Sequence, residues 1–121
     1  MPRTKATTEY LPLTPVVLHI LLALARENLH GYAISQDVEE QTAGAVRLGP
    51  GTLYGSLQRL VEAGLIRETA APADADGAHA ERRRYYAITA AGRRALRADA
   101  DRLATAVRLT RARLGAEPER A

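Results

Sequence analysis

A long helical pattern near the C-terminus, residues 89–114, limits the fold more than any other feature of the sequence. Thr89 supplies a side-chain cap at its start, and no proline interrupts it. A helix of about 25 residues is about 37 Å long, which is more than a small domain covers with its own body. Apolar residues recur along it at spacings of three and four, as in the seam of a coiled coil, so we expect a second copy of the chain to pack there. The predicted dimer interface consists of Leu96, Ala100, Leu103, Val107, Thr110 and Leu114.

Three shorter helical patterns precede this segment. The first begins with Thr14 as a hydroxyl cap and Pro15 at the first helical position, and its apolar run VVLHILLALA predicts a central helix that is covered on most sides. The second, residues 31–44, is a short amphipathic helix. The third follows the turn LGPG and ends at Gly64, which predicts a glycine cap. Its buried stripe consists of Leu53, Leu57, Leu60 and Val61.

After Gly64 the sequence changes character. Two short segments, LIRET and RRYYAIT, are rich in β-branched or aromatic residues and predict a two-stranded hairpin with a long flexible loop at residues 71–80. Helices followed by a hairpin are the order of a winged helix-turn-helix, so we predict a mainly α (α+β) fold of that kind with a long C-terminal dimerisation helix. The expected organisation is a flexible N-terminal arm (residues 1–13), a winged helix-turn-helix DNA-binding domain (14–88), the dimerisation helix (89–114) and a tail (115–121).

Composition favours a nucleic-acid partner. The 121 residues suffice for one domain, and the absence of Phe and Trp predicts an aliphatic core. The net charge of the chain is only +3, but residues 81–114 contain ten arginines and three acidic residues, a net charge of +7. Such a basic segment favours double-stranded DNA as the partner, with an anionic membrane second. Solvated helix faces are the alternative explanation for the later arginines.

The outer face of the third helix has the chemistry that a DNA groove requires. Opposite its leucines lie small or hydrogen-bonding residues, which allow close approach and meet phosphates and base edges. Glycine inside a helix costs about 1 kcal/mol relative to alanine, and close approach of DNA at Gly55 would compensate for that cost. The predicted DNA-binding residues are Thr52, Tyr54, Gly55, Ser56, Gln58 and Arg59 on this helix, and Arg82, Arg83 and Arg84 at the second strand.

Several of these residues also have a simpler interpretation. Thr52 suits a helix cap, Tyr54 suits packing on the neighbouring helix, and Arg59 suits a solvated position. The three arginines of the hairpin would also protect a strand edge from aggregation. For single residues, both interpretations stay open.

Three segments carry a resemblance to a known family. They read HGYAIS (residues 30–35), LGPGTLYGSLQRLVEAGLIRE (48–68) and RRRYYAITAAGRRAL (82–96), and together they resemble the PadR family of bacterial transcriptional regulators. The resemblance implies a winged helix-turn-helix dimer that binds an operator, usually as a repressor, and often releases it when a small molecule binds. The resemblance also implies that the GTLY helix is the recognition helix and that Tyr32 contacts the DNA backbone. The chain itself resembles the short subgroup of the family, in which a single C-terminal helix forms the dimer.

Two departures limit what the resemblance implies. Many members have a proline where Gly55 stands, so the local approach to DNA differs here. Some short members bind flat aromatic ligands between tryptophans, and this chain has no Trp, so that pocket is not carried over. A small-molecule effector of unknown class is therefore expected. The two-fold symmetry of a homodimer predicts an inverted-repeat operator.

The sequence does not indicate an enzyme. It contains no Cys, and its three histidines, His19, His30 and His79, are scattered, so neither a nucleophile with its base nor a metal-ligand cluster is apparent. We expect no catalytic residues, no metal and no cofactor. The apolar run at residues 16–25 is too short to span a bilayer, and the C-terminal helix lacks the bulky anchors of a membrane-surface helix. These features predict a cytoplasmic protein without a membrane partner.

The main alternative function is a winged-helix protein-interaction adaptor without specific DNA binding, because a fold does not determine a function. Such an adaptor would carry apolar or acidic residues on the outer face of the third helix. The predicted face has neither.

Overall fold

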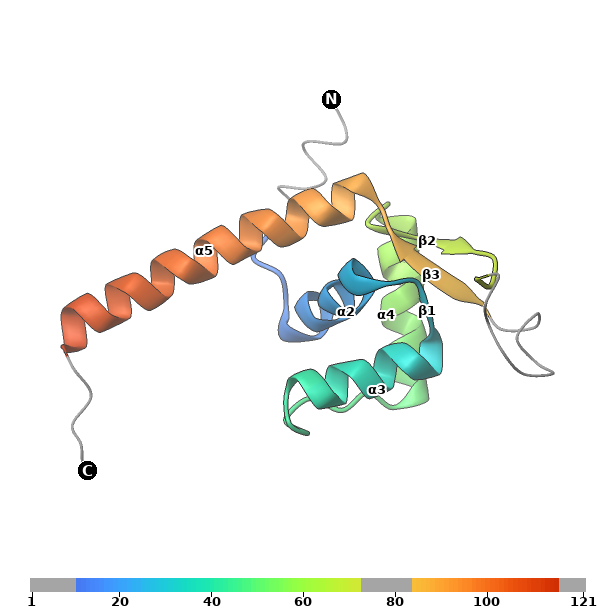
Figure 1. Cartoon of the computed structure of the whole chain (residues 1–121), viewed down its shortest axis with the longest axis horizontal. Helices are drawn as coiled ribbons and strands as arrows, with labels where there is room; N and C mark the ends of the chain where they lie inside the picture. The colour runs from blue at the N-terminus through green and yellow to red at the C-terminus, as the bar shows by residue number, and fades with distance from the viewer. Residues whose placement is uncertain (1–10, 73–83, 116–121) are drawn as a thin grey trace.

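The computed structural model describes residues 11–72 and 84–115, which form four helices and a small sheet (Figure 1). The N-terminal residues 1–10, most of the predicted loop at 71–80 with His79, and the tail residues 116–121 lie outside the described part. The elements are α2 (Pro15–Arg26), β1 (Leu29–His30), α3 (Gly31–Gln41), α4 (Pro50–Glu62), β2 (Ile66–Thr69), β3 (Tyr85–Ile88) and α5 (Ala90–Leu114).

Side-chain caps stand at the beginning of α2, α3 and α5. The Thr14 hydroxyl accepts a hydrogen bond from the Val17 amide at 3.2 Å, and the Thr89 hydroxyl accepts one from the Gly92 amide at 3.1 Å. Both caps are as predicted, because a hydroxyl satisfies an amide that the first helical turn leaves unpaired. His30 caps α3 through Nδ1, which accepts from the Ala33 amide at 3.4 Å. Gly64 follows α4 with a φ of 80°, in the left-handed region that favours glycine, which confirms the predicted glycine cap.

The sheet has three strands where the sequence predicted two. β3 lies in the middle, antiparallel to both neighbours, and β2 and β3 form the predicted hairpin, called the wing below. The additional strand is β1, whose Leu29 pairs with Tyr86 and whose His30 pairs with Tyr85. A strand of two residues is too short to show a period-two pattern, so the sequence indicated only the end of a helix there.

The core lies between α2, α3, α4, the sheet and the first half of α5. It is mostly leucine, isoleucine and valine, but Tyr85 and Tyr86 are also buried, so the prediction of a wholly aliphatic core was wrong. The prediction that α2 is covered on most sides is confirmed. Within its apolar run, residues 16–25, only Leu22 is exposed, at 41%, and the other residues are buried or half-buried.

Two features at the ends of the described part bear on function. Leu13, which we assigned to the flexible arm, is only 7% exposed and belongs to the core, so the arm does not extend to it. Helix α5 begins beside the sheet, passes over α2 and then extends beyond the body (Figure 1). Every residue from 100 to 115 is exposed in the single chain.

Candidate nucleic-acid interface

Helix α4 buries one face in the core and exposes the opposite one. Leu53, Leu57 and Leu60 form the buried stripe, as predicted, while Thr52, Gln58 and Arg59 are exposed and Gly55 is half-buried. Ser56 does not lie on the exposed face, contrary to the prediction, because only 4% of it is accessible. It follows Leu53 by three residues and precedes Leu60 by four, a spacing that places it on the leucine stripe.

Tyr54 joins the beginning of α4 to the beginning of α3. It is 50% exposed, and its ring lies against Gly31, where an added Cβ would be 2.5 Å from the Tyr54 hydroxyl oxygen. This is the packing on a neighbouring helix that the simpler interpretation gave for Tyr54. The next residue, Tyr32, is 65% exposed, and its hydroxyl accepts a hydrogen bond from Gln36 Nε2 at 3.2 Å. Tyr54 therefore presents an accessible phenol group on α4, and Tyr32 presents one at the beginning of α3, the helix that Tyr54 contacts.

The wing and α4 enclose a hollow of about 350 Å³ that brings three predicted DNA-binding residues together. Tyr54 and Gln58 come from α4, and Arg84 comes from the residue that precedes β3. Arg82 and Arg83 lie outside the described residues. Arg84 Nη1 is 3.9 Å from Glu68 Oε2, an exposed ion pair of little energetic weight. Val61, Glu62, Glu68 and Tyr86 complete the lining.

The acidic residues of this hollow were missed at the sequence level. Glu62 is exposed and its Oε2 accepts a hydrogen bond from Gln58 Nε2 at 3.4 Å. The spacing of four from Gln58 is a signal that places Glu62 on the outer face, so the statement that this face carries no acidic residue was wrong. Burial and, to a lesser extent, the charge of Glu68 raise the pKa of the Tyr86 phenol, which therefore stays neutral at physiological pH.

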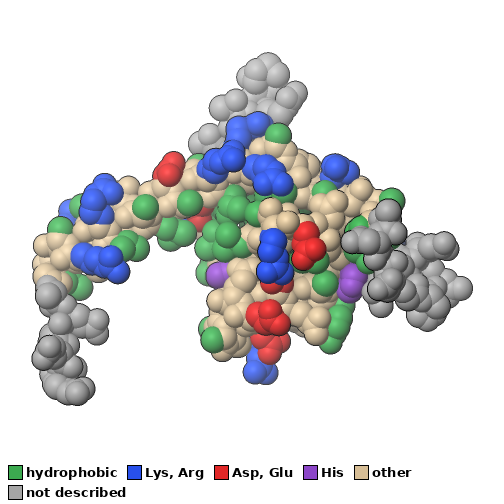
Figure 2. Space-filling model, in the orientation of Figure 1, with side chains coloured by type: hydrophobic (Ala, Val, Ile, Leu, Met, Phe, Trp, Pro, Cys, Tyr) green, Lys and Arg blue, Asp and Glu red, His purple; other side chains and the backbone are tan. Residues whose placement is uncertain are grey.

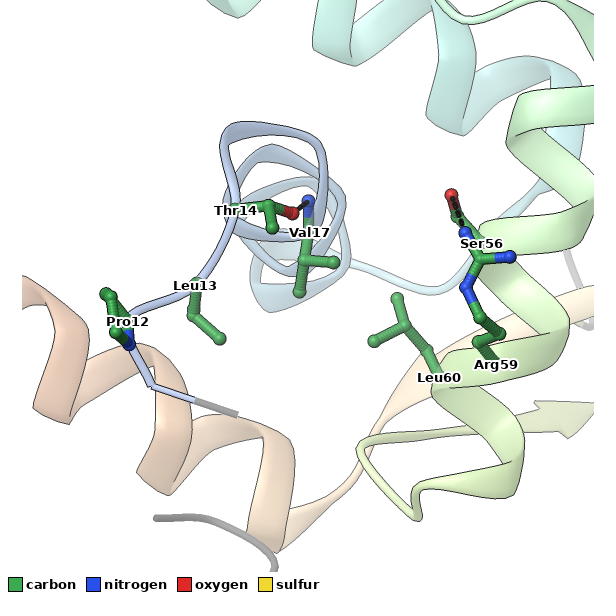
Figure 3. Close-up of a pocket in the computed structure, with 7 residues that line it drawn as sticks. All are labelled: Pro12, Leu13, Thr14, Val17, Ser56, Arg59 and Leu60. Carbon is green, nitrogen blue, oxygen red and sulfur yellow. Dashed lines mark hydrogen bonds between the residues drawn. The ribbon is translucent and has the colours of Figure 1, made fainter. Parts of the chain in front are cut away.

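A second hollow, of about 280 Å³, lies on the other side of α4 (Figure 3). Ser56, Arg59 and Leu60 face the segment that enters α2 across it. The Arg59 guanidinium turns back along the helix, since its Nη2 donates to the Ser56 hydroxyl at 3.4 Å and its Nη1 lies 3.5 Å from where a Cβ on Gly55 would be. Pro12, Leu13, Thr14 and Val17 line the opposite wall.

Most of the predicted dimer interface on α5 is exposed in the single chain. Leu96 is partly buried against the core, whereas Leu103, Val107 and Leu114 are 36%, 48% and 78% exposed. Ala100 and Thr110 are exposed as well, and the Thr110 hydroxyl donates to the Ala106 carbonyl at 2.7 Å, so it needs no partner from another chain. Hydrophobic side chains gather in the angle between α5 and the body (Figure 2).

Helix α5 packs on its own body with a different face. The residues buried there are Gly92, Ala95 and Asp99. At about 100° per residue, this face lies about a fifth of a turn from the predicted seam. The seam is thus left open while α5 stays attached to its own chain.

Residues 11–72 and 84–115 contain no group of three potential metal-ligating side chains. No helix of this part has the length and apolar character needed to cross a membrane. His19, the histidine of the first helix, is half-buried, and its Nδ1 lies 2.7 Å from Gln41 Oε1.

A sequence profile and two curated relatives match the chain. The profile described as "Transcriptional regulator PadR-like family" matches residues 20–98. An uncharacterised 37.1 kDa protein in transposon TN4556 of Streptomyces fradiae is 44% identical over 85 residues, 70% of this chain, but the match spans only 22% of that protein. The transcriptional regulator Rv3488 of Mycobacterium tuberculosis is 37% identical over 84 residues, which cover 69% of this chain and 71% of the relative.

Solved structures share the fold. A PadR family transcription regulator from Clostridium difficile R20291 superposes with a TM-score of 0.69 at 24% identity, covering 84% of this chain and all (100%) of that one. The PadR protein of Bacillus subtilis, solved in complex with operator DNA, gives a TM-score of 0.57 at 23% identity and covers 71% of this chain and 45% of that one. At these identities the likeness shows the winged-helix fold.

Proposed function

The chain belongs to the PadR-like family of transcriptional regulators, and on that premise we propose that this DNA-binding regulator is a homodimeric repressor. Its proposed target is an inverted-repeat operator, which it releases when a small molecule binds. Residues 14–88 would form the DNA-binding domain and 89–114 the dimerisation helix. Because the target is DNA, the proposed location is the cytoplasm.

The observation that carries the proposal is the outer surface of α4 and its surroundings. Thr52, Gln58 and Arg59 are exposed on one helix, with the half-buried Gly55 between them. The Tyr54 phenol adjoins this surface, Tyr32 is exposed at the start of the helix that Tyr54 contacts, and Arg84 of the wing shares a hollow with Tyr54 and Gln58. Short polar side chains, a phenol pair and a flanking arginine suit a helix in the major groove, held by contacts to the phosphate backbone.

The dimeric part of the proposal is supported by α5. An isolated helix gains little stability from its own hydrogen bonds in water, so a projecting helix with exposed leucine and valine favours a packing partner. Pairing two copies by a two-fold axis would place two α4 helices on one side of the dimer. The half-sites are then expected about 34–36 Å, one helical turn of DNA, or a multiple of it apart.

The ligand-responsive part is supported by the hollow between α4 and the segment entering α2 (Figure 3). Its walls are mostly apolar, with Ser56 and Arg59 as polar groups. A small molecule held there would contact Arg59 directly. Because Arg59 is a proposed DNA contact, occupation of the hollow would change the DNA-binding surface without a large movement.

A fluorescence-anisotropy titration tests the DNA-binding proposal. The purified protein is titrated against the DNA immediately upstream of its own gene and against scrambled DNA of equal length, at several salt concentrations. We expect tighter binding to the upstream DNA, with a logarithmic salt slope of about 0.9 for each phosphate contact. Equal and weak binding to both DNAs would contradict autoregulation.

Two arginine variants locate the surface. Arg59→Ala is expected to weaken specific binding by about 1–3 kcal/mol, because it removes a guanidinium from the DNA-facing side of α4. Arg108→Ala makes the same change in charge on the exposed far half of α5 and serves as the matched control. Equal losses in both variants would show that only net charge matters, and would remove α4 as the recognition helix.

A protein-interaction adaptor is the second candidate, and Glu62 is the observation that favours it. This exposed carboxylate on the outer face of α4 is unfavourable beside DNA phosphates. Glu62→Gln separates the two functions. A regulator should bind DNA equally well or more tightly after the change, whereas an adaptor should show no DNA specificity before or after it.

A further inference from the structure

Asp99 is a charged side chain that the chain buries completely at the point where α5 leaves the body. Its exposed fraction is 0%, whereas every residue from 100 to 115 is exposed. Oδ1 accepts two hydrogen bonds, one from Arg102 Nε at 2.8 Å and one from the Leu13 amide at 3.3 Å. Oδ2 is buried and has no hydrogen-bond partner in the part of the chain that the structure describes.

This arrangement is costly, and nothing proposed above for DNA binding uses it. A carboxylate loses its hydration when it is buried, and an unpaired oxygen adds to that loss. The hydrogen bond from Arg102 holds the pKa of the Asp99 carboxyl below its ordinary value, so the group is charged at neutral pH. An apolar residue of similar volume would fill the same space at lower cost. An apolar residue would not, however, supply a directional hydrogen bond, and only such a bond restricts the relative orientation of the two groups it joins.

The hydrogen bonds of Asp99 connect two elements, α2 and α5, whose relative orientation matters for a dimer. Leu13 directly precedes Thr14, the cap of α2, and its own side chain is buried. Asp99 therefore ties the start of α2 to α5, between residues 86 positions apart in the sequence. Gly92 and Ala95 pack earlier on the same face of α5, so Asp99 is the last of these attachments before the helix projects.

The free part of α5 acts as a lever beyond this attachment. From residue 99 to residue 114 the helix extends about 22 Å, so a change of about 10° at Asp99 displaces its end by about 4 Å. In a dimer joined by this part of the helix, the same change alters the distance between the two α4 helices.

We propose that Asp99 is a positioning residue that fixes the angle between α5 and the DNA-binding body, and through it the spacing of the two DNA half-sites that a dimer binds. The first part concerns the chain alone. The second part rests on the proposed function.

Spin labels test the first part directly, because the chain has no cysteine and single ones can be introduced at will. Labels are attached at Glu40→Cys on α3 and Ala112→Cys near the end of α5, two exposed positions, and labelled chains are diluted with unlabelled ones so that only distances within a chain are measured. Residue 112 lies about 20 Å beyond Asp99 along the helix, so Asp99→Ala should widen the distance distribution by about 3 Å. The matched control Asp101→Ala, which removes an exposed carboxylate two residues away, should leave it narrow.

Two milder variants guard against loss of folding. Asp99→Asn keeps an oxygen for the Leu13 amide and for Arg102, so it should retain most of the narrow distribution. Arg102→Met removes one donor from a partly exposed side chain and should widen the distribution in the same direction, but less than alanine at position 99. A distribution that stays narrow in both Asp99→Ala and Arg102→Met would overturn the proposal.

DNA duplexes with half-sites moved apart in single-base-pair steps test the second part. The wild type should prefer one spacing, and Asp99→Ala should reduce that preference by about threefold to tenfold. Binding to a single half-site should stay within about twofold of the wild type, since Asp99 hydrogen-bonds to Leu13 and Arg102 and to none of the proposed DNA contacts. An unchanged spacing profile in Asp99→Ala would refute the link to DNA. If the wild type binds no operator, the proposed function fails, while the spin-label widths still decide the role of Asp99 in the chain.

Discussion

At the scale of single residues, Gly55 gives the sharpest test of the DNA-binding face. Gly55→Ala should raise the free energy of unfolding by about 0.5–1 kcal/mol, because alanine loses less backbone entropy in a helix. The structure has room for it, since the new Cβ would meet only Arg59 Nη1, at 3.5 Å. Operator affinity should fall, because the methyl group would occupy the space into which we propose that DNA approaches. Denaturant unfolding and anisotropy titration measure both effects, and a variant that gains stability with unchanged affinity would contradict close approach at this position.

Gly31 provides a second residue-scale prediction through its contact with Tyr54. In Gly31→Ala the new Cβ would lie 2.5 Å from the Tyr54 hydroxyl oxygen and 2.8 Å from Cζ, so the ring must turn away. The end of a flexible side chain moves easily, and we expect a stability loss below about 1 kcal/mol but weaker operator binding.

A double-mutant cycle separates this effect from a general one. In a Tyr54→Ala background, Gly31→Ala should have no further effect on DNA affinity, because the ring that it displaces is gone. Additive losses would show that Gly31 acts on DNA binding independently of Tyr54.

Residue-level inference from the sequence succeeded where the determining contact is local. The caps at Thr14 and Thr89 depend on an amide three residues away, which the sequence displays. It failed for the buried polar residues. Ser56 lies on the leucine stripe but was read as outward because its chemistry suits DNA, and Asp99 was not singled out because its partner Leu13 is 86 positions away.

At the scale of elements, the beginning of α5 is fitted tightly against the chain. A Cβ on Gly92 would collide with the Leu65 carbonyl oxygen and lie 2.8 Å from Ile88 Cγ1. Backbone cannot move aside as a flexible side chain does, so Gly92→Ala should lower the free energy of unfolding by about 3 kcal/mol. Gly51→Ala is the matched control, because nothing lies within 4 Å of the added Cβ there. Chemical denaturation measures the free energy of unfolding of both variants. Equal values would show that the close contact at Gly92 does not attach α5 to the body.

The elements themselves were predictable to different degrees. The four helices follow from apolar spacing and caps, since both are properties of neighbouring residues. The pairing of β1 with β3 was not predictable, because Leu29 and His30 become a strand only when Tyr86 and Tyr85 lie beside them. The two hollows beside α4 follow from how the helix packs against the wing and against the segment entering α2, and neither arrangement is visible in a local pattern.

At the scale of the whole molecule, the chain is a compact body with a projecting helix (Figure 1). The body carries the candidate DNA surface and the helix carries the candidate dimer surface, and Asp99 lies where the two meet. In the described part of segment 81–114, the arginines are Arg84 beside α4 and those of α5. Among these described arginines, only Arg84 lines the hollow that contains the proposed DNA contacts Tyr54 and Gln58. The charge of α5 is thus better explained as a solvated surface than as part of the α4 interface.

The dimer surface can be tested with two leucines of similar exposure that occupy different sides of α5. Leu103 and Leu109 are 36% and 42% exposed, but at about 100° per residue Leu109 points away from the predicted seam. Leu103→Glu should give monomers in sedimentation and weaker operator binding, because a dimer would have to bury the new charge. Leu109→Glu should remain dimeric. If Leu109→Glu dissociates and Leu103→Glu does not, the two chains pair through the opposite side of α5, and the angle that Asp99 fixes would then set a different half-site spacing.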